Sequence, residues 1–132
     1  MYKESELTGK IIGAAIAVHN EIGPGFQERI YHQALIVALD SLGLHTESEK
    51  EFNIVFRDTW VGTFRLDIAV EGRVVVELKS IVGEMSKLFQ TQTISYLKAS
   101  GLEVGLLINF GNQSLEVKRL ARYSNYQNTR CS

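Results

Sequence analysis

The sequence has little of what marks a secreted or membrane-bound protein. It has one cysteine, Cys131, so it cannot form an internal disulfide bond, and a reducing cytoplasm suits it best. Its longest apolar stretch near the start, Ile11 to Val18, is far shorter than the ~20 residues that cross a bilayer. No basic and then apolar signal segment follows Met1. We therefore expect a cytoplasmic protein without a membrane span.

An excess of positive charge is also missing. The 132 residues carry a formal net charge of −1, which excludes a generally basic nucleic-acid binder. The charge is uneven, because residues 1–60 hold five Lys or Arg and nine Asp or Glu, whereas residues 61–132 hold nine and six. Cations at the end form either a patch for a phosphate backbone or, as we favour, a solvated tail. They are Lys118, Arg119, Arg122 and Arg130.

Proline is nearly absent, and the one that occurs separates two helical patterns. Apolar residues recur at helical spacing over residues 5–21 and 26–42, and Gly23-Pro24-Gly25 ends the first helix. We expect one domain over residues 1–120, an α/β fold with a mixed sheet flanked by helices, and a polar tail over 121–132. The expected strands are 52–56, 64–70, 74–81, 104–110 and a candidate edge strand at 115–120, with a third helix at 85–100.

Two acidic residues stand inside apolar strands, where a charge is costly. Asp67 and Glu77 each have apolar neighbours on both sides, and Lys79 shares a strand face with Glu77. Two carboxylates placed close together need a proton or a cation between them. A hard divalent cation such as Mg²⁺ suits oxygen ligands. The alternative is a plain salt bridge from Asp67 to Arg65 or Lys79.

The register between the two strands decides whether the acids meet. We take positions 64, 66, 68 and 70 as the apolar face of the first strand, which leaves Asp67 on its polar face. Asp67 then stands opposite Glu77 only if the turn has three residues, 71–73, because a one-residue slip turns every side chain to the other face. Gly72 would take a positive φ in such a turn.

These residues resemble a known nuclease signature. Asp67, followed on the next strand by Glu77-x-Lys79, is similar to the motif of the PD-(D/E)XK nuclease superfamily. Gly25, Glu28 and Tyr31 fit the GxxExxY pattern of a small bacterial branch of that superfamily. Three segments resemble that branch in the same order, and the resemblance covers about residues 8–120. They are GPGFQERIYHQAL, FRLDIAVEGRVVVELKSI and QTISYLKASGLEVGLLINFG.

The resemblance implies a fold, a cofactor and a set of site residues. The fold is restriction-endonuclease-like, a central mixed sheet with helices on both sides. Asp67 and Glu77 would bind Mg²⁺ or Mn²⁺, and Glu28 on the preceding helix would be the third acid. Lys79 would orient the attacking water or steady the charge on the phosphate.

The resemblance also implies a substrate and its contacts. Gln92 and Tyr96 lie one helical turn apart and would contact the site or the substrate. Arg65 is a further candidate for substrate binding or support. The expected partner is nucleic acid, DNA in preference to RNA, and the chain is a candidate homodimer.

Two positions depart from the family pattern. Leu66 precedes Asp67 where the superfamily name has proline, and Phe89 stands where many relatives have histidine. Two other readings therefore stay open: a non-catalytic nucleic-acid-binding or regulatory module, and a structural homodimer with a vestigial site. The complete set of Asp67, Glu77 and Lys79 favours the metal-dependent nuclease.

Other polar and aromatic residues are interpreted as structural. The three histidines have no zinc-ligand spacing, although His19 lies just before the turn that leads to Glu28. Tyr31 is expected in the core, with its hydroxyl bonded to Glu28 or a neighbour. Trp60 is expected to pack at the rim of the fold, with stacking on a base as the alternative.

Overall fold

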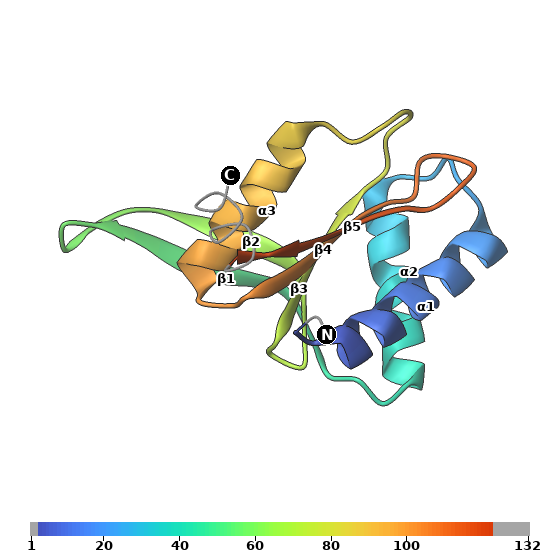
Figure 1. Ribbon diagram of the computed structural model, residues 1–132, viewed down its shortest axis with the longest axis horizontal. Helices are drawn as coiled ribbons and strands as arrows, with labels where there is room; N and C mark the ends of the chain where they lie inside the picture. Colours follow the sequence, from blue (N-terminus) through green and yellow to red (C-terminus); the bar gives the residue numbers. More distant parts are fainter. Residues whose placement is uncertain (1–2, 123–132) are drawn as a thin grey trace.

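The computed structural model describes residues 3–122, which form three helices and five strands (Figure 1). The strands stand in the order β1-β2-β3-β4-β5, and only β3 and β4 run parallel, joined through α3. This mixed sheet confirms the expected fold class. The elements are α1 (Ser5–Ile22), α2 (Glu28–Ser41), β1 (Thr46–Phe56), β2 (Thr59–Val70), β3 (Val74–Lys79), α3 (Lys87–Ser100), β4 (Val104–Asn109) and β5 (Glu116–Ala121).

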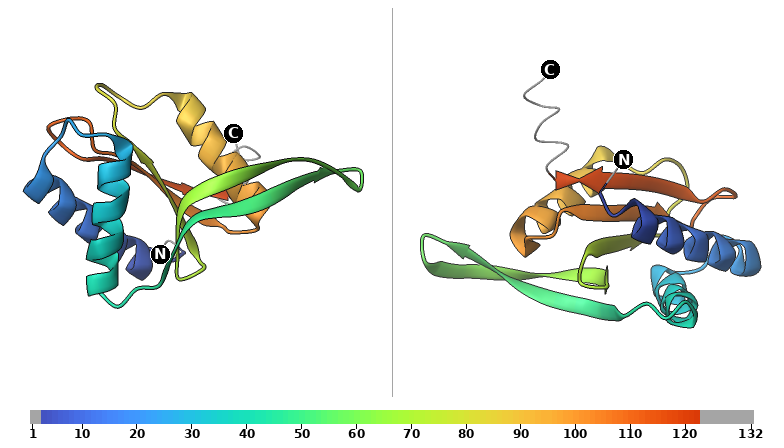
Figure 2. Two further views of the ribbon diagram at one scale, coloured as in Figure 1. Left: turned by 180° about the vertical axis from the view of Figure 1, so that it is seen from behind. Right: turned by 60° about the horizontal axis from the view of Figure 1, so that its bottom comes forward.

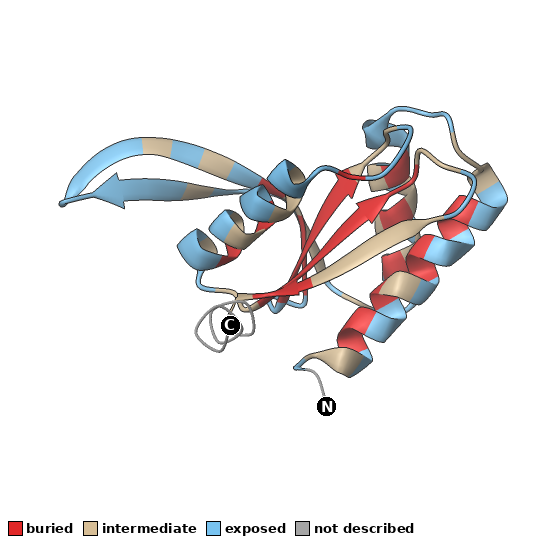
Figure 3. Cartoon of the chain, turned by 45° about the horizontal axis from the view of Figure 1, so that its top comes forward, coloured by how far each residue is buried: buried red, intermediate tan, exposed pale blue. Residues whose placement is uncertain are grey.

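Helices cover both faces of the sheet. Val76 and Leu78 of β3 lie in one buried cluster with Ile11 of α1 and Tyr31 of α2. The intervening residue of β3, Val75, packs on the other face, in a cluster that includes Leu97 of α3. The buried residues therefore concentrate on the central strands and the inward helix faces (Figure 3). None of the described helices is long and apolar enough to cross a membrane.

The turn between β2 and β3 confirms the predicted register. Val70 pairs with Val74 and Ala69 with Val75, which leaves residues 71–73 as a three-residue turn. The N–H of Arg73 donates to the carbonyl of Val70 at 3.0 Å. Gly72 has a φ of 64°, in the left-handed region that glycine adopts at little cost.

The predicted single apolar face of β2 is wrong. Phe64 and Leu66 pack towards α3, whereas Ile68 and Val70 pack towards α1 and α2. The strand twists between Leu66 and Ile68. The backbone pairing of β2 with β3 also ends there, at Ile68. Across from this point, Glu49 of β1 has a φ of 51°, which breaks the regular strand.

Strands β1 and β2 continue beyond the sheet as a two-stranded arm. Figure 2 shows this ribbon extending away from the helices, and residues 53–63 make up most of its outer part. Trp60 lies on the arm with 62% of its surface exposed, so the expected packing at the rim of the core is wrong.

The basic cluster near the end divides into two parts. Lys118 and Arg119 belong to β5 and are half-buried, so the solvated-tail interpretation fails for them. Arg119 donates a hydrogen bond to the carbonyl of Lys3. Arg130 and Cys131, with most of the predicted tail, lie outside the described residues.

Candidate active site

Asp67 and Glu77 meet where β2 separates from β3. The N–H of Asp67 donates to Glu77 Oε2 at 2.9 Å, and the N–H of Leu78 donates to Asp67 Oδ2 at 2.8 Å. Each carboxylate thus satisfies a backbone group on the opposite strand, at the position where the ladder stops. The two side chains therefore converge, as the register predicts.

The two carboxyl groups repel one another in a largely dry setting. Burial raises the pKa of Glu77 to about 8, and the charge of Asp67 adds to the shift. Burial also raises the pKa of Asp67, with a smaller contribution from Glu49, although the N–H of Leu78 opposes the rise. Without a cation, the pair holds a proton near neutral pH.

The donor chemistry of the pair fits a hard divalent cation. Asp67 Oδ1 and Glu77 Oε1 accept none of the hydrogen bonds formed within residues 3–122, so an oxygen of each carboxylate is available. A cation there would relieve the repulsion that raises both pKa values. Over the described residues, however, no three His, Cys, Asp or Glu side chains already stand together as a metal-binding group.

Lys79 stands beside the acids without forming a salt bridge to Asp67. Its Nζ lies 4.4 Å from the centroid of the Phe89 ring, a cation–π contact with α3. Its charge lowers the pKa of both Asp67 and Glu77. Arg65 pairs with Glu51 at 3.0 Å instead of turning to Asp67. In the part of the chain that the structure describes, no ion pair joins Asp67 to either cation, so the plain salt bridge is wrong.

A pocket of ≈ 380 Å³ opens on the site from the side of α2. Glu28, in the first turn of α2, lines it together with Asp67, and the charge of Glu28 raises the pKa of Glu77. The exposed Glu28 side chain therefore stands near the pair, and its role as a third ligand stays a prediction. The remaining lining residues are Arg29, His32, Gln33, Glu49 and Leu78.

Tyr31 fixes the chain where it enters α2. Its hydroxyl donates to the carbonyl of Gly23 at 2.6 Å and accepts from the N–H of Phe26 at 3.1 Å, so its partners are neighbours in the turn. Gly25 within that turn has a φ of 105°, which a side chain would rarely tolerate. Ser80 Oγ, one residue after Lys79, donates to the carbonyl of Phe26 at 2.6 Å. These bonds hold the start of α2, and thus Glu28, against the end of β3.

Helix α3 brings one of its two predicted residues close to the acids. The Tyr96 ring stacks on Phe64 with centroids 4.9 Å apart. Burial raises the pKa of the Tyr96 hydroxyl, and the charges of Glu77 and Asp67 add to the shift. Gln92 is exposed one turn earlier on the same helix, so its substrate contact stays a prediction.

Five of the seven pocket residues were not expected to belong to it, and two of these, His32 and Glu49, act on the pKa of Asp67. His32 hydrogen-bonds Ser48 Oγ through Nε2 at 2.7 Å, and its charge lowers the pKa of Asp67. Its position four residues after Glu28 on one helix face was the available signal. Glu49 lies across from Asp67 between two paired residues of β1, which only the β1–β2 register could reveal. His19 is buried and bonded to the carbonyl of Asn112 at 2.8 Å, a structural role.

Comparisons with known proteins agree with the fold of this chain. The family model described as the PD-(D/E)XK nuclease superfamily matches residues 5–120. Among solved structures, one titled "Crystal structure of SSO0001" has a TM-score of 0.58 and 22% sequence identity to this chain. The likeness, which concerns the fold, covers 89% of this chain and 58% of that longer chain. No curated protein matches this chain.

Proposed function

Because the chain belongs to the PD-(D/E)XK nuclease superfamily, we propose that it hydrolyses phosphodiester bonds of nucleic acid with Mg²⁺ or Mn²⁺ held by Asp67 and Glu77. One observation carries the proposal: two carboxylates with raised pKa values converge at the fork between β2 and β3, where Asp67 lines a pocket. This arrangement is costly without a cation. DNA is the proposed substrate in preference to RNA.

The residues around the pair have complementary roles in this proposal. A bound divalent cation would lower the pKa of a water molecule and neutralise phosphate oxygens. Lys79 supplies a fixed positive charge that orients the attacking water or steadies the charge developing on the phosphate. The ring of Phe89 limits where the ammonium group can sit, because the contact holds it at 4.4 Å.

Residues on the two helices would complete the substrate contacts. Arg29 and Gln33 line the pocket from α2, where a cation and an amide can bind phosphate oxygens. Glu28 would add a third carboxylate to the cation site. Tyr96 and Gln92 would approach from α3. Arg65 would support the strand that carries Asp67 through its pair with Glu51.

The family branch and the cellular setting are further parts of the proposal. We propose that the chain belongs to the bacterial GxxExxY branch; the spacing of Gly25, Glu28 and Tyr31 supports this, and the bonds of Tyr31 give that spacing a physical reason. A cytoplasmic location follows the low cysteine content. A homodimer remains a candidate assembly.

Cleavage assays with matched variants test the proposal. Wild-type protein is incubated with labelled single- and double-stranded DNA and RNA, with Mg²⁺, Mn²⁺ or EDTA. We expect cleavage only with a cation, and none for Asp67→Asn, which loses the charge of a ligand. Lys79→Ala should cut about a few hundredfold more slowly while keeping metal affinity, since it removes one electrostatic stabiliser.

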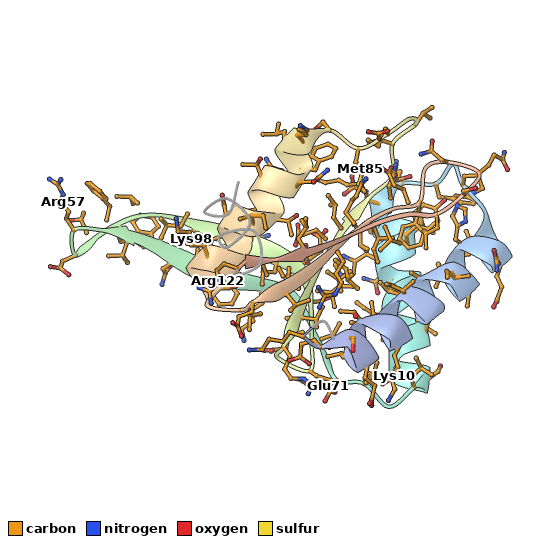
Figure 4. All side chains as sticks on the ribbon, viewed as in Figure 1. Lys10, Arg57, Glu71, Met85, Lys98 and Arg122 are labelled. Atoms are coloured by element: carbon orange, nitrogen blue, oxygen red, sulfur yellow. The ribbon has the colours of Figure 1, made fainter. Side chains whose placement is uncertain are left out.

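An exposed lysine on α3 provides the control for Lys79. Lys98→Ala removes the same charge in the last turn of that helix and should cleave at the wild-type rate (Figure 4). If wild type cuts no nucleic acid with either cation, the nuclease function is excluded. The alternative function, a non-catalytic nucleic-acid-binding or regulatory module, is then favoured. If Lys79→Ala cuts as fast as wild type, Lys79 does not have the role assigned to it.

A further inference from the structure

The outer part of the β1–β2 arm carries large apolar side chains in solvent. The arm is mostly exposed, in contrast to the buried central strands (Figure 3). Its turn is Arg57-Asp58, with both φ values positive, and Arg57 marks the far end in Figure 4. The exposed apolar side chains are Ile54, Val55, Phe56, Trp60 and Val61. Exposed groups of this size gathered on one projection indicate a binding surface.

These side chains lie on both faces of the ribbon. Val55 pairs with Trp60 and Phe56 with Thr59, so alternation along the strand puts Val55 and Trp60 on one face and Phe56 on the other. The register shifts between Ile54 and Val55, which increases the twist near the tip. A flat partner surface would cover only one face. An apolar ribbon with two such faces suits a narrow slot between two layers.

The charge and the origin of the arm favour a polyanion as its partner. Lys50 and Arg65 pair with Glu47 and Glu51, which leaves Arg57 at the tip as the cation of residues 50–65 that no ion pair among the described residues engages. The guanidinium of Arg57 lies 4.9 Å from the Phe56 ring centroid, so a cation and an aromatic ring stand together at the tip. The arm begins at the candidate site, because β2 carries Asp67 itself. At ~3.3 Å per residue, Trp60 lies roughly 23 Å along the strand from Asp67.

We propose that the tip of this arm inserts between bases of the nucleic acid and stacks Trp60 and Phe56 on bases that are unpaired or readily opened. The inference rests on the proposed function for its substrate class, but not on hydrolysis. Apolar wedges enter base steps, and aromatic rings stack on any base through its π-face. The site would then act a fixed distance from a fork, bulge or single-stranded end.

The fluorescence of Trp60 tests this directly, since it is the only tryptophan in the chain. Wild-type protein in EDTA is titrated with a single strand, a forked duplex and a blunt duplex of the same sequence. EDTA prevents cleavage, so the result does not depend on catalysis. We expect saturable quenching by the single strand and the fork, at several-fold lower concentrations than for the blunt duplex.

Two substitutions separate the arm from the rest of the surface. Phe56→Ala leaves the reporter in place and should weaken binding about 5-fold or more, the loss of one base-stacking contact. Val37→Ala removes an equally exposed apolar side chain on α2 and should bind as wild type does. Thermal melts of both variants show whether the fold is intact.

Three results would overturn the inference. One is the absence of quenching by every nucleic acid at low salt, and another is equal quenching by the blunt duplex and the fork. The third is a shift of Trp60 emission to shorter wavelength as protein concentration alone rises, together with a dimer mass in sedimentation. That result would mean that a second copy of the chain covers the arm.

Discussion

At the scale of single residues, Glu77 makes the stability of the protein depend on pH. Its pKa is about 8 in the folded state and near 4.5 in an unfolded chain, because burial and the charge of Asp67 disfavour ionisation. The folded state therefore binds the extra proton between these values. The stability that this group contributes is fully present below pH 4.5 and is lost as the pH rises through 8.

Glu77→Gln should remove that dependence. The amide oxygen can still accept the N–H of Asp67, but the side chain no longer titrates. In EDTA, the unfolding free energy of the wild type should fall as the pH rises from 5 to 8. Compared with the variant, the extra loss should be up to about 1.4 kcal/mol per pH unit. Denaturant unfolding at several pH values measures the difference.

The matched control is an exposed glutamate on α1. Glu6→Gln removes a carboxylate that is mostly in solvent and should keep the wild-type pH dependence. Parallel pH curves for wild type and Glu77→Gln would contradict the electrostatic account of the pair.

The convergence of the two acids could be predicted because they violate a local rule. Asp67 and Glu77 are charges inside apolar strands, and the turn length fixes that they face each other. His32 and Glu49 could not be found in this way, because each has ordinary polar neighbours in the sequence. Their approach to Asp67 depends on how α2 and β1 lie against β2, and this is a tertiary property.

At the scale of elements, the close approach of two loops next to the site depends on Gly111. A Cβ built on Gly111 would lie 2.1 Å from the carbonyl oxygen of Ile81, far inside van der Waals contact. The N–H of Gly111 also donates to Asn109 Oδ1, whose amide group binds the carbonyl of Ile81. The segment that follows Lys79 can therefore rest on β4 only if position 111 has no side chain.

Gly111→Ala should destabilise the protein by at least about 2 kcal/mol, because the backbone of Ile81 must move. Gly13→Ala is the control, since its new Cβ meets nothing within 4 Å on the exposed face of α1. That change should stabilise by up to about 1 kcal/mol through helix propensity. Urea unfolding of both variants measures the two effects. An unchanged unfolding free energy for Gly111→Ala would show that position 111 has room for a Cβ beside Ile81.

The elements themselves were predictable where apolar periodicity was strong. The helices and the buried strand β4 follow the expected ranges closely, because the burial of their inward faces requires apolar residues at a regular spacing in the sequence. β1 begins at Thr46, six residues before its predicted start, since the segment 46–51 is polar and largely exposed. The twist of β2 at Asp67 was missed because alternation assumes a regular strand, and the positive φ of Glu49 is not visible in the sequence.

At the scale of the whole molecule, the acidic pocket must be reconciled with an anionic substrate. Glu28, Glu49 and Asp67 line the pocket and Glu77 lies beside Asp67, so the four acids make the electrostatic potential more negative where the phosphate would bind. A divalent cation reverses that balance, and it binds the folded chain only, because the two strands bring the acids together. Metal binding, stability and the binding of a phosphate group in this pocket should therefore be linked.

Saturating Mg²⁺ or Mn²⁺ should raise the melting temperature of the wild type. A cation at 100 times its Kd stabilises by about 2.7 kcal/mol, which corresponds to a rise on the order of 10 °C in a domain of this size. Asp67→Asn should abolish the rise. Asp58→Asn, at the exposed turn of the arm, should keep it. An unchanged melting temperature in saturating metal would count against a cation site.

The most direct test of the central claim is the position of Mn²⁺ in a crystal soaked with that ion, located by its anomalous scattering. The claim is that Asp67 and Glu77 together hold the cation at the fork of β2 and β3. It predicts a peak within ~2.5 Å of an oxygen of each carboxylate, the outer limit for a hard cation. A peak that touches neither carboxylate, or no peak at saturating Mn²⁺, would contradict it.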